Sequence, residues 1–330
     1  MWRWPLLIGA TLLLIARKRP SCPEEGLQLR DLTPLLHDSA TFRRIFGPRT
    51  IFFVETSGRA VLSPRQVCTL ESFARLNPEF NLLMVFLKPA VRFREQENEA
   101  LAAVLPHHTN IHLTTIDAKT AMDTSGFPEM HHLVSQSGDY LRHLSNCVRL
   151  VLIWRFGGAY LDLDVISFKS LSPELLQNPN LVAPMNSERL NNAFLQFRQG
   201  HPLVEGFIKR LRVTYNVSQR SEASRSLEQV LLNASGLSAV HQLITQGHVR
   251  DVVLPDFRLI SSAHPRDFGL FFHPTRGHEL LPQIAASKAI HLYSYKSHGM
   301  LTPLESSSII ANLSRRVCPR AFWSCSNFFY

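Results

Sequence analysis

This chain of 330 residues has little cysteine, fewer acidic than basic side chains, and no apolar run of full transmembrane length. None of its five cysteines has the spacing of a zinc site, and their odd number leaves at least one unpaired. No internal repeat or low-complexity stretch is present, which excludes a solenoid and a disordered protein. A hydrophobic fraction of 45% is that of an ordinary globular protein.

The excess of positive charge limits the class of partner. The formal net charge is +9 and the isoelectric point is about 9.6, which suits nucleic acid, an anionic membrane surface or a phosphorylated substrate. The basic residues are scattered along the chain, however, and neither zinc-finger spacing nor an RNA-stacking aromatic motif is found. We therefore expect no nucleic-acid partner and favour a diphosphate-bearing substrate. The oligomeric state is left open.

The N-terminus carries an apolar run from Pro5 to Ala16, followed by Arg17, Lys18 and Arg19. This run is shorter than a typical bilayer span, so it is either a signal-peptide core or a short anchor. Because no small-x-small cleavage site follows, we expect an uncleaved signal-anchor over residues 1–19, a stem over 20–48 and a catalytic domain over 49–330. The basic flank alone would favour the cytosolic side, whereas the glycosylation sequons at Asn216, Asn233 and Asn312 weakly favour the lumen.

Alternating strand and helix patterns predict an α/β fold with a mostly parallel central sheet and helices on both faces. The segment before Pro48 is expected to be irregular. Strands are predicted over 50–54, 82–87, 111–116, 181–183, 193–197 and 289–293, and helices over 67–76, 94–104, 140–156, 202–212 and 227–232. Cys147 lies inside the longest predicted helix and is expected to be a buried thiol. The pairing of the other cysteines is not predicted.

The stretch from Trp154 to Asp164 presents two carboxylates after an apolar helix and a pair of glycines. On an extended segment Asp162 and Asp164 face the same side, as ligands of a hard cation and its phosphates do. Gly157 and Gly158 are expected to take positive φ and to let a substrate approach the backbone. The alternative is a solvated turn whose carboxylates only cap the next element, but the apolar surroundings make this less favoured.

Polar residues also follow the first predicted strand, at Glu55, Thr56, Ser57 and Gly58. Ligands of open α/β sheets bind at the carboxyl ends of strands, where the strand order reverses. The segments 55–58 and 162–164 are therefore predicted to lie together at this edge. The alternative for the first segment is a strand-end cap.

Several segments, in the same order from about residue 50 to 320, resemble the α-1,4-glycosyltransferase family. They are Ile51–Ser57, Cys68–Ser72, Leu144–Ser145 with Arg149, Trp154–Asp164, Asn191 with Ala193–Phe194, Ala289–His291 and Cys318–Pro319. The resemblance implies a GT-A-like fold, a single-pass type II Golgi membrane protein with a luminal catalytic domain, a UDP-sugar donor, Mn²⁺ or Mg²⁺, and transfer with retention.

The resemblance also implies roles for individual residues. Asp162 and Asp164, with His291 from a late strand, are predicted metal ligands. Asp162, Asp164 and Arg149 are the predicted catalytic set, and Arg149 is expected to contact the sugar or phosphate of the donor. His291 has an alternative role as a hydrogen-bonded histidine inside the sheet.

The predicted donor-binding residues are Glu55, Thr56, Ser57, Asn146, Arg149, Asp162 and Asn191. Three departures from the family pattern surround the predicted pocket. Asn146 replaces an aspartate, the acceptor-side loop reads Ser221 to Arg225 without glycine or proline, and Tyr293 and Ser294 replace tryptophan and asparagine. The change at Asn146 leaves the donor sugar open, and the three changes together leave a weakened or inactive enzyme as an alternative.

Stabilisation of the leaving group is the central chemistry of such an enzyme. Breakage of the anomeric bond places negative charge on the departing diphosphate, which a cation held by the aspartates neutralises. No carboxylate identifies itself as a nucleophile, so front-face attack by the acceptor is favoured by the resemblance alone.

The predicted function is a retaining transfer of galactose or N-acetylgalactosamine to a glycolipid acceptor such as a lactosylceramide-type glycosphingolipid. The alternatives are an α-1,4-N-acetylglucosaminyltransferase acting on glycoproteins, a weakened family member that acts as a binding partner, and an enzyme that uses water or a protein hydroxyl as acceptor.

Overall fold

A computed structural model describes residues 29–88, 97–125, 131, 139–214, 222–261 and 263–330. The expected anchor over 1–19 lies outside these residues. Within the part of the chain that is described, no helix is both long and apolar enough to cross a bilayer.

One sheet of nine strands organises the chain, in the order β1-β4-β3-β2-β5-β8-β7-β10-β9. The neighbours from β1 through β5 run parallel, whereas β8 is antiparallel to both β5 and β7. The strand bounds are β1 Arg30–Asp31, β2 Thr50–Glu55, β3 Asn81–Leu87, β4 Ile111–Ile116, β5 Gly158–Leu161, β7 Leu181–Pro184, β8 Leu190–Phe197, β9 His248–Val249 and β10 Val252–Val253. The predicted mostly parallel sheet is therefore confirmed.

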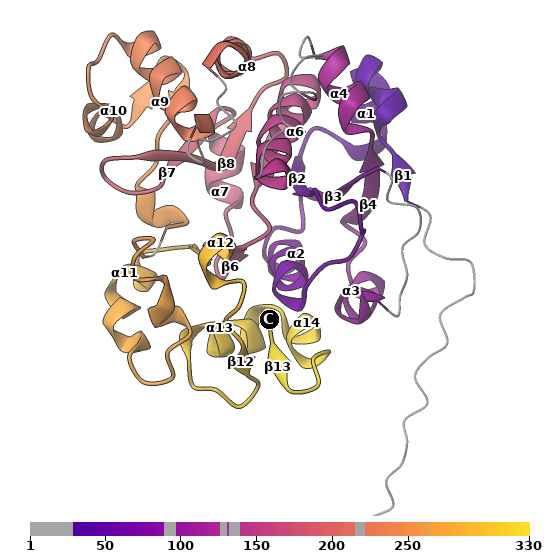
Figure 1. The fold of residues 1–330 in the computed structure, drawn as a ribbon, viewed down its shortest axis with the longest axis vertical. Helices are drawn as coiled ribbons and strands as arrows, with labels where there is room; N and C mark the ends of the chain where they lie inside the picture. Colours follow the sequence, from indigo (N-terminus) through magenta and orange to yellow (C-terminus); the bar gives the residue numbers. More distant parts are fainter. Residues whose placement is uncertain (1–28, 89–96, 126–130, 132–138, 215–221, 262) are drawn as a thin grey trace, which may run out of the picture.

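Two shorter sheets and a set of helices complete the described fold (Figure 1). The small sheets pair β6 Val165–Ser167 with β11 Ala289–His291, and β12 Thr302–Pro303 with β13 Phe328–Phe329. The α-helices are α1 Ser39–Phe46, α2 Pro64–Leu76, α3 Glu99–Val104, α4 Ala118–Thr124, α6 Tyr140–Phe156, α7 Ser172–Gln177, α8 Pro202–Thr214, α9 Glu222–Ser235, α10 Val240–Gln246, α11 Leu281–Ala285, α12 Ser294–Ser297, α13 Ile309–Val317 and α14 Pro319–Trp323. Short 3₁₀ helices span Thr33–His37, Leu105–His107, Phe257–Leu259, Phe268–Phe271 and Gly277–Leu280.

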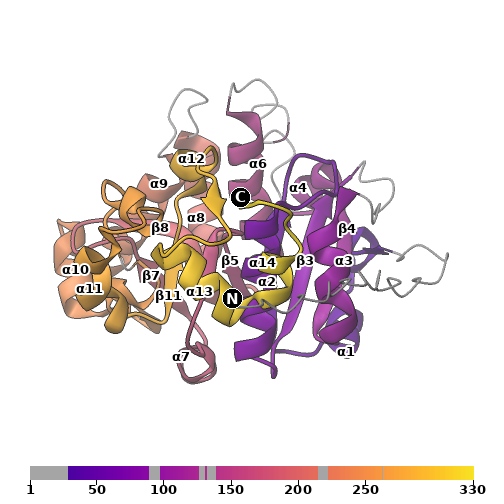
Figure 2. The same ribbon diagram turned by 90° about the horizontal axis from the view of Figure 1, so that it is seen from below.

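Helices cover both faces of the large sheet because its strands alternate between two hydrophobic cores. In β2, Ile51 and Phe53 belong to a core with α2, α3, α13 and α14, whereas Phe52 and Val54 belong to a core with α1, α6, α8 and α9. Figure 2 shows the yellow C-terminal segment beside α2, in agreement with the contacts of α13 and α14 with that helix. A disulfide between Cys68 and Cys318 links the same elements, and Cys147 is the buried free thiol that was predicted.

Four features differ from the sequence-based expectation. The segment before Pro48 is not irregular, because α1 buries Phe42 and Phe46 at helical spacing and Phe42 stacks 4.0 Å from Phe156. The last predicted strand ends at His291 rather than residue 293, since Tyr293 adopts φ +52° and directly precedes α12. No bounds were predicted for strands β5 and β6, which flank the aspartates, although Asp162 was expected near the end of a strand. Residues from Glu222 onward form the first turn of α9 instead of a loop.

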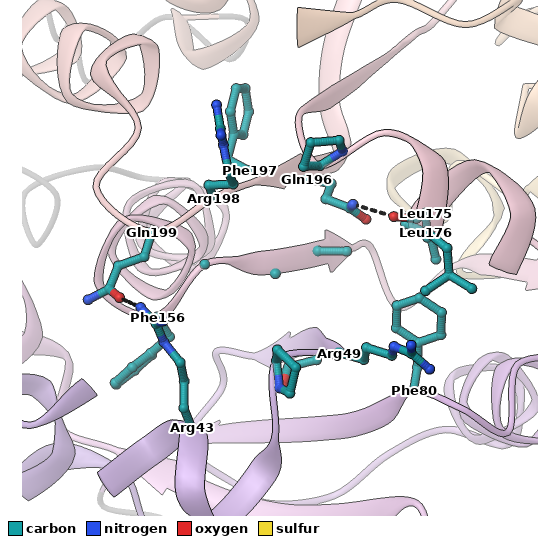
Figure 3. Close-up of a pocket in the computed structure, with 16 residues that line it drawn as sticks. Arg43, Arg49, Phe80, Phe156, Leu175, Leu176, Gln196, Phe197, Arg198 and Gln199 are labelled. Atoms are coloured by element: carbon teal, nitrogen blue, oxygen red, sulfur yellow. Dashed lines mark hydrogen bonds between the residues drawn. The ribbon is translucent and has the colours of Figure 1, made fainter. Parts of the chain in front are cut away.

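The glycine pair has a different role from the one expected. Gly157 and Gly158 do take positive φ, of +71° and +98°. A Cβ on Gly158 would lie 2.6 Å from the Thr50 carbonyl oxygen, so the close approach is to β2 and not to a substrate. These glycines line a cavity of about 410 Å³ at the amino end of β5, which Arg43 and Arg49 flank in Figure 3. The aspartates lie at the opposite end of this strand.

Candidate functional site

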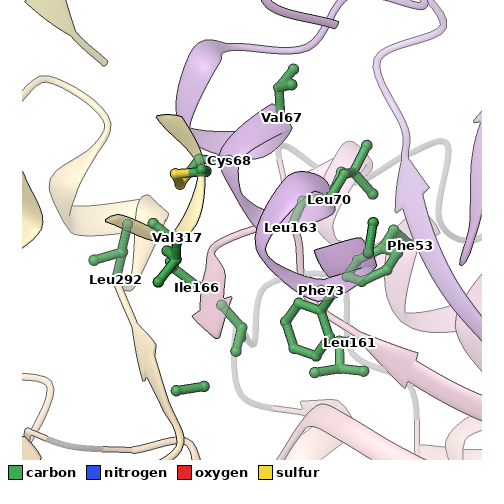
Figure 4. Packing of buried hydrophobic residues seen from close by; sticks show 14 of the residues in the cluster. Phe53, Val67, Cys68, Leu70, Phe73, Leu161, Leu163, Ile166, Leu292 and Val317 are labelled. Atoms are coloured by element: carbon green, nitrogen blue, oxygen red, sulfur yellow. A yellow bond between two sulfur atoms is a disulfide. The ribbon is translucent and has the colours of Figure 1, made fainter. Parts of the chain in front are cut away.

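The turn that carries Asp162 and Asp164 packs against the core that contains α2, α3, α13 and α14. Leu161 and Leu163 are buried against Phe53 and Phe73, as Figure 4 shows. Strand β5 ends at Leu161, and Leu163 and Asp164 form a turn before β6. Antiparallel pairing of β6 with β11 places His291 opposite Val165, next to Asp164. The two aspartates therefore do not share one extended strand, but the turn still keeps them together.

Asp162, Asp164 and His291 meet at one point. One potential ligand atom from each lies within 4.8 Å of those from the other two. His291 Nε2 is 3.1 Å from Asp164 Oδ1, and the Ser294 backbone N–H donates to Asp164 Oδ2 at 2.6 Å. The other ring nitrogen, His291 Nδ1, is buried and makes no hydrogen bond to a described residue. Two carboxylates and an imidazole gathered this closely fit a divalent cation such as Mn²⁺.

The environment gives the two carboxyl groups different proton affinities. Burial raises the pKa of Asp162, and the nearby Arg149 guanidinium offsets this only in part. Burial also acts on Asp164, but the His291 imidazole outweighs it and holds the pKa of Asp164 at about 2. Burial opposes protonation of His291, yet the Asp164 carboxylate raises the pKa of His291 above 6.5. Of the two carboxyl groups, Asp164 is therefore the one whose charged form is stabilised by its surroundings.

These residues form one wall of a cavity of about 560 Å³. It spans the carboxyl ends of β2 and β5 and the start of β8, at the point where the strand order reverses. Its polar lining residues are Gln66, Arg142, Ser145, Asn146, Arg149, Tyr160, Asp162, Asp164, Arg189, Asn191, Asn192, Ser224, His291, Tyr293, Ser294 and Tyr295.

The structure brings most of the predicted donor-binding residues to this cavity. Asn146 and Asn191 line it, and Asn146 Oδ1 accepts a hydrogen bond of 2.9 Å from Asn192 Nδ2. Arg149 also lines it, but its guanidinium is bonded to protein groups, including Asp162 Oδ1 at 3.1 Å.

Glu55, Thr56 and Ser57 are not among the described residues that line the cavity, although the adjacent Val54 is. The Glu55 carboxylate accepts a hydrogen bond from the Ser57 backbone N–H at 2.7 Å, which matches the strand-end cap. Thr56 donates from its hydroxyl to the Leu141 carbonyl oxygen at 3.0 Å.

Three polar residues of the site were missed by the sequence analysis. Tyr160 donates from its hydroxyl to Asp162 Oδ1 at 2.7 Å, and its position two residues before Asp162 on the strand was the available signal. Asn192 accepts at its carbonyl oxygen from Arg149 Nη1 at 2.7 Å, and Ser145 accepts from the same guanidinium. Ser145 lies four residues before Arg149 on α6, and this helical spacing was the available signal, whereas Asn192 on β8 is too far along the chain from Arg149 to give one.

Two sequence families match consecutive parts of the chain. Residues 63–182 match the family described as a glycosyltransferase sugar-binding region containing a DXD motif, and residues 196–325 match the α-1,4-glycosyltransferase conserved region. The first range contains Asp162 and Asp164, and the second contains His291.

Curated relatives cover most of the chain. Lactosylceramide 4-α-galactosyltransferase of Rattus norvegicus is 26% identical over 84% of this chain and 76% of its own length. α-1,4-N-acetylglucosaminyltransferase of Homo sapiens is 24% identical over 83% and 80%, respectively. Among solved structures, an active-site mutant of LgtC aligns with a TM-score of 0.46 and 14% identity, covering 82% of this chain and 95% of that one. The fold is therefore defined by the strand order of its own sheet and not by this likeness.

Proposed function

Since the chain belongs to the α-1,4-glycosyltransferase family and is a glycosyltransferase, we propose that it transfers galactose or N-acetylgalactosamine from a UDP-sugar to a glycolipid. The acceptor is of the lactosylceramide type and the anomeric configuration is retained. The observation that carries the proposal is the Asp162, Asp164 and His291 cluster on the wall of the cavity at the carboxyl edge of the sheet. The relatives in which α-1,4 transfer is named support the linkage.

Each part of the cavity has a role in this reaction. Asp162, Asp164 and His291 hold the cation, Mn²⁺ by preference, which supplies Lewis-acid neutralisation of the departing diphosphate. Asn146 and Asn191 face the donor sugar with amide groups that hydrogen-bond its hydroxyls. The nucleotide lies toward Val54 at the end of β2, and the fold is of the GT-A type. No further carboxylate lines the cavity among the described residues, which favours front-face attack by the acceptor hydroxyl over a double displacement.

We also propose the cellular setting. The apolar run before residue 17 acts as a signal-anchor, and the catalytic domain lies in the Golgi lumen as that of a type II protein. The disulfide between Cys68 and Cys318 supports an oxidising compartment.

A donor and acceptor panel tests the function. Full-length protein in detergent is assayed with UDP-galactose, UDP-N-acetylgalactosamine and UDP-N-acetylglucosamine, against lactosylceramide and a glycoprotein acceptor, with Mn²⁺ or with EDTA. We expect Mn²⁺-dependent α-1,4 transfer to lactosylceramide. Asp164→Asn should abolish it, because the amide keeps the size of the side chain but removes the charge that holds the cation. Transfer to the glycoprotein from UDP-N-acetylglucosamine would support the relative of that name instead, and binding without turnover would indicate a non-catalytic member.

A further inference from the structure

Tyr160 contacts one of the two carboxylates directly, although its side chain is buried. It lies on β5 with 1% of its surface exposed, and its hydroxyl donates to Asp162 Oδ1 at 2.7 Å. Residues 160 and 162 point to the same side because their spacing is that of a strand. The remaining oxygen, Asp162 Oδ2, accepts no hydrogen bond from a described residue, while the side chain keeps 28% of its surface exposed.

Arg149, on α6, contacts Asp162 Oδ1, the same oxygen that the Tyr160 hydroxyl binds. Its guanidinium lies 4.3 Å from the centre of the Tyr160 ring, and its Nη1 lies 3.1 Å from Asp162 Oδ1. The Arg149 guanidinium, which lies over the Tyr160 ring, and the Tyr160 hydroxyl therefore contact the same carboxylate oxygen of Asp162. A cation–π contact between groups that are removed from water is stronger than one at the surface.

The other bonds of Arg149 fix it in this place. Nη1 donates to the Asn192 carbonyl oxygen at 2.7 Å, Nη2 to Ser145 Oγ at 2.9 Å and Nε to the Ser145 carbonyl oxygen at 3.2 Å. Only 4% of the Arg149 surface is exposed. A guanidinium bonded on so many sides is a support for Asp162 rather than a group free to bind a diphosphate.

We propose that Tyr160 and Arg149 are positioning residues that hold Asp162 by Oδ1, so that Oδ2 is the oxygen presented to the cation. This inference rests on the metal-dependent transfer proposed above, and it changes the expected role of Arg149 from direct contact to support. Groups that orient a metal ligand by hydrogen bonds typically change metal affinity by about 10–100-fold when they are removed.

The test measures Mn²⁺ affinity rather than activity alone. Full-length wild type and Tyr160→Phe are titrated with Mn²⁺ in detergent, and free Mn²⁺ is followed by electron paramagnetic resonance. We expect Tyr160→Phe to raise the Kd for Mn²⁺ about 10-fold or more. It should also shift the Mn²⁺ concentration for half-maximal transfer by the same factor, while kcat recovers at saturating Mn²⁺. A merely structural defect would lower the melting temperature of the cation-free protein without shifting the Mn²⁺ midpoint.

Tyr140→Phe is the matched control. Tyr140, the first residue of α6, is partly buried against the core that contains Tyr160, but it does not line the cavity. Its substitution should leave the Kd for Mn²⁺ within about twofold of wild type. If Tyr160→Phe gives no cooperative unfolding transition, Ser145→Ala decides instead, because it removes the oxygen that fixes Arg149 Nη2 and should raise the Kd in the same direction.

Two negative results are distinguishable. Wild type that binds no Mn²⁺ would overturn the proposed function and this inference with it. Wild type that binds Mn²⁺ while the deciding variant retains an unchanged Kd would overturn only the positioning role.

Discussion

Replacement of Gly158 by alanine should force β5 away from β2. The new Cβ would lie 2.6 Å from the Thr50 carbonyl oxygen, which is backbone and cannot rotate aside. The residue must also keep φ near +98°, a region that costs an L-residue about 1–2 kcal/mol. Forcing extra atoms into packed structure typically costs about 1–3 kcal/mol more. We therefore expect Gly158→Ala to lower the free energy of unfolding by about 2–5 kcal/mol.

Gly200 provides the control for this substitution. It also has a positive φ, of +68°, but no atom lies within 4 Å of an added Cβ. Gly200→Ala should therefore cost only the conformational share, about 1–2 kcal/mol. Urea unfolding followed by tryptophan fluorescence gives both values under the same conditions. Equal losses for the two variants would show that β5 does not depend on close contact with β2, and would refute the role assigned here to the second glycine.

Two further predictions concern the disulfide and the candidate metal centre. The Cys68–Cys318 bond closes a loop with a sequence separation of 250, so the double variant Cys68→Ala/Cys318→Ala should lose about 2–5 kcal/mol of stability; an unchanged melting temperature would contradict this. In cation-free protein the Asp164 carboxylate outweighs burial and raises the pKa of His291 above 6.5, so the imidazolium stabilises the fold fully below pH 6.5 and this contribution is lost as the pH rises through the raised pKa. Denaturant unfolding in EDTA should show stability falling across that window in wild type and a flatter profile in His291→Gln; identical profiles would argue against the Asp164–His291 pair.

Most of the central sheet was predictable because its strands are short apolar runs separated by amphipathic helices. The strands at 50–55, 81–87 and 111–116, and the helix at 140–156, agree with their patterns closely. The bounds of strand β5 were not predicted, because Gly158–Leu161 is only four residues long and follows directly on α6. Helix α1 was missed because Phe42 and Phe46 are a single apolar pair in a polar segment. Short elements of this kind are selected by tertiary packing rather than by local propensity.

The candidate site, like the fold, was predictable from the sequence only in part. The Asp-x-Asp pair after two glycines indicated a cation site from local chemistry alone, and the strand pattern placed it at the carboxyl edge of the sheet. The structural role of Gly158 could not be predicted from the local sequence. Only the pairing of β5 with β2 shows that the Thr50 carbonyl oxygen occupies the space a side chain would need.

The sequence by itself therefore determined the class of fold, the chemistry of the acidic pair and the edge of the sheet where it lies, since these follow from hydrophobic period and side-chain type. The tertiary structure alone decided how the distant groups contact the acidic pair. His291 reaches Asp164 through the pairing of β11 with β6, and Arg149 and Tyr160 converge on one oxygen of Asp162 from a helix and a strand. The contacts of His291 and Arg149 join residues on different elements, so no local pattern encodes them, whereas Tyr160 lies only two residues before Asp162.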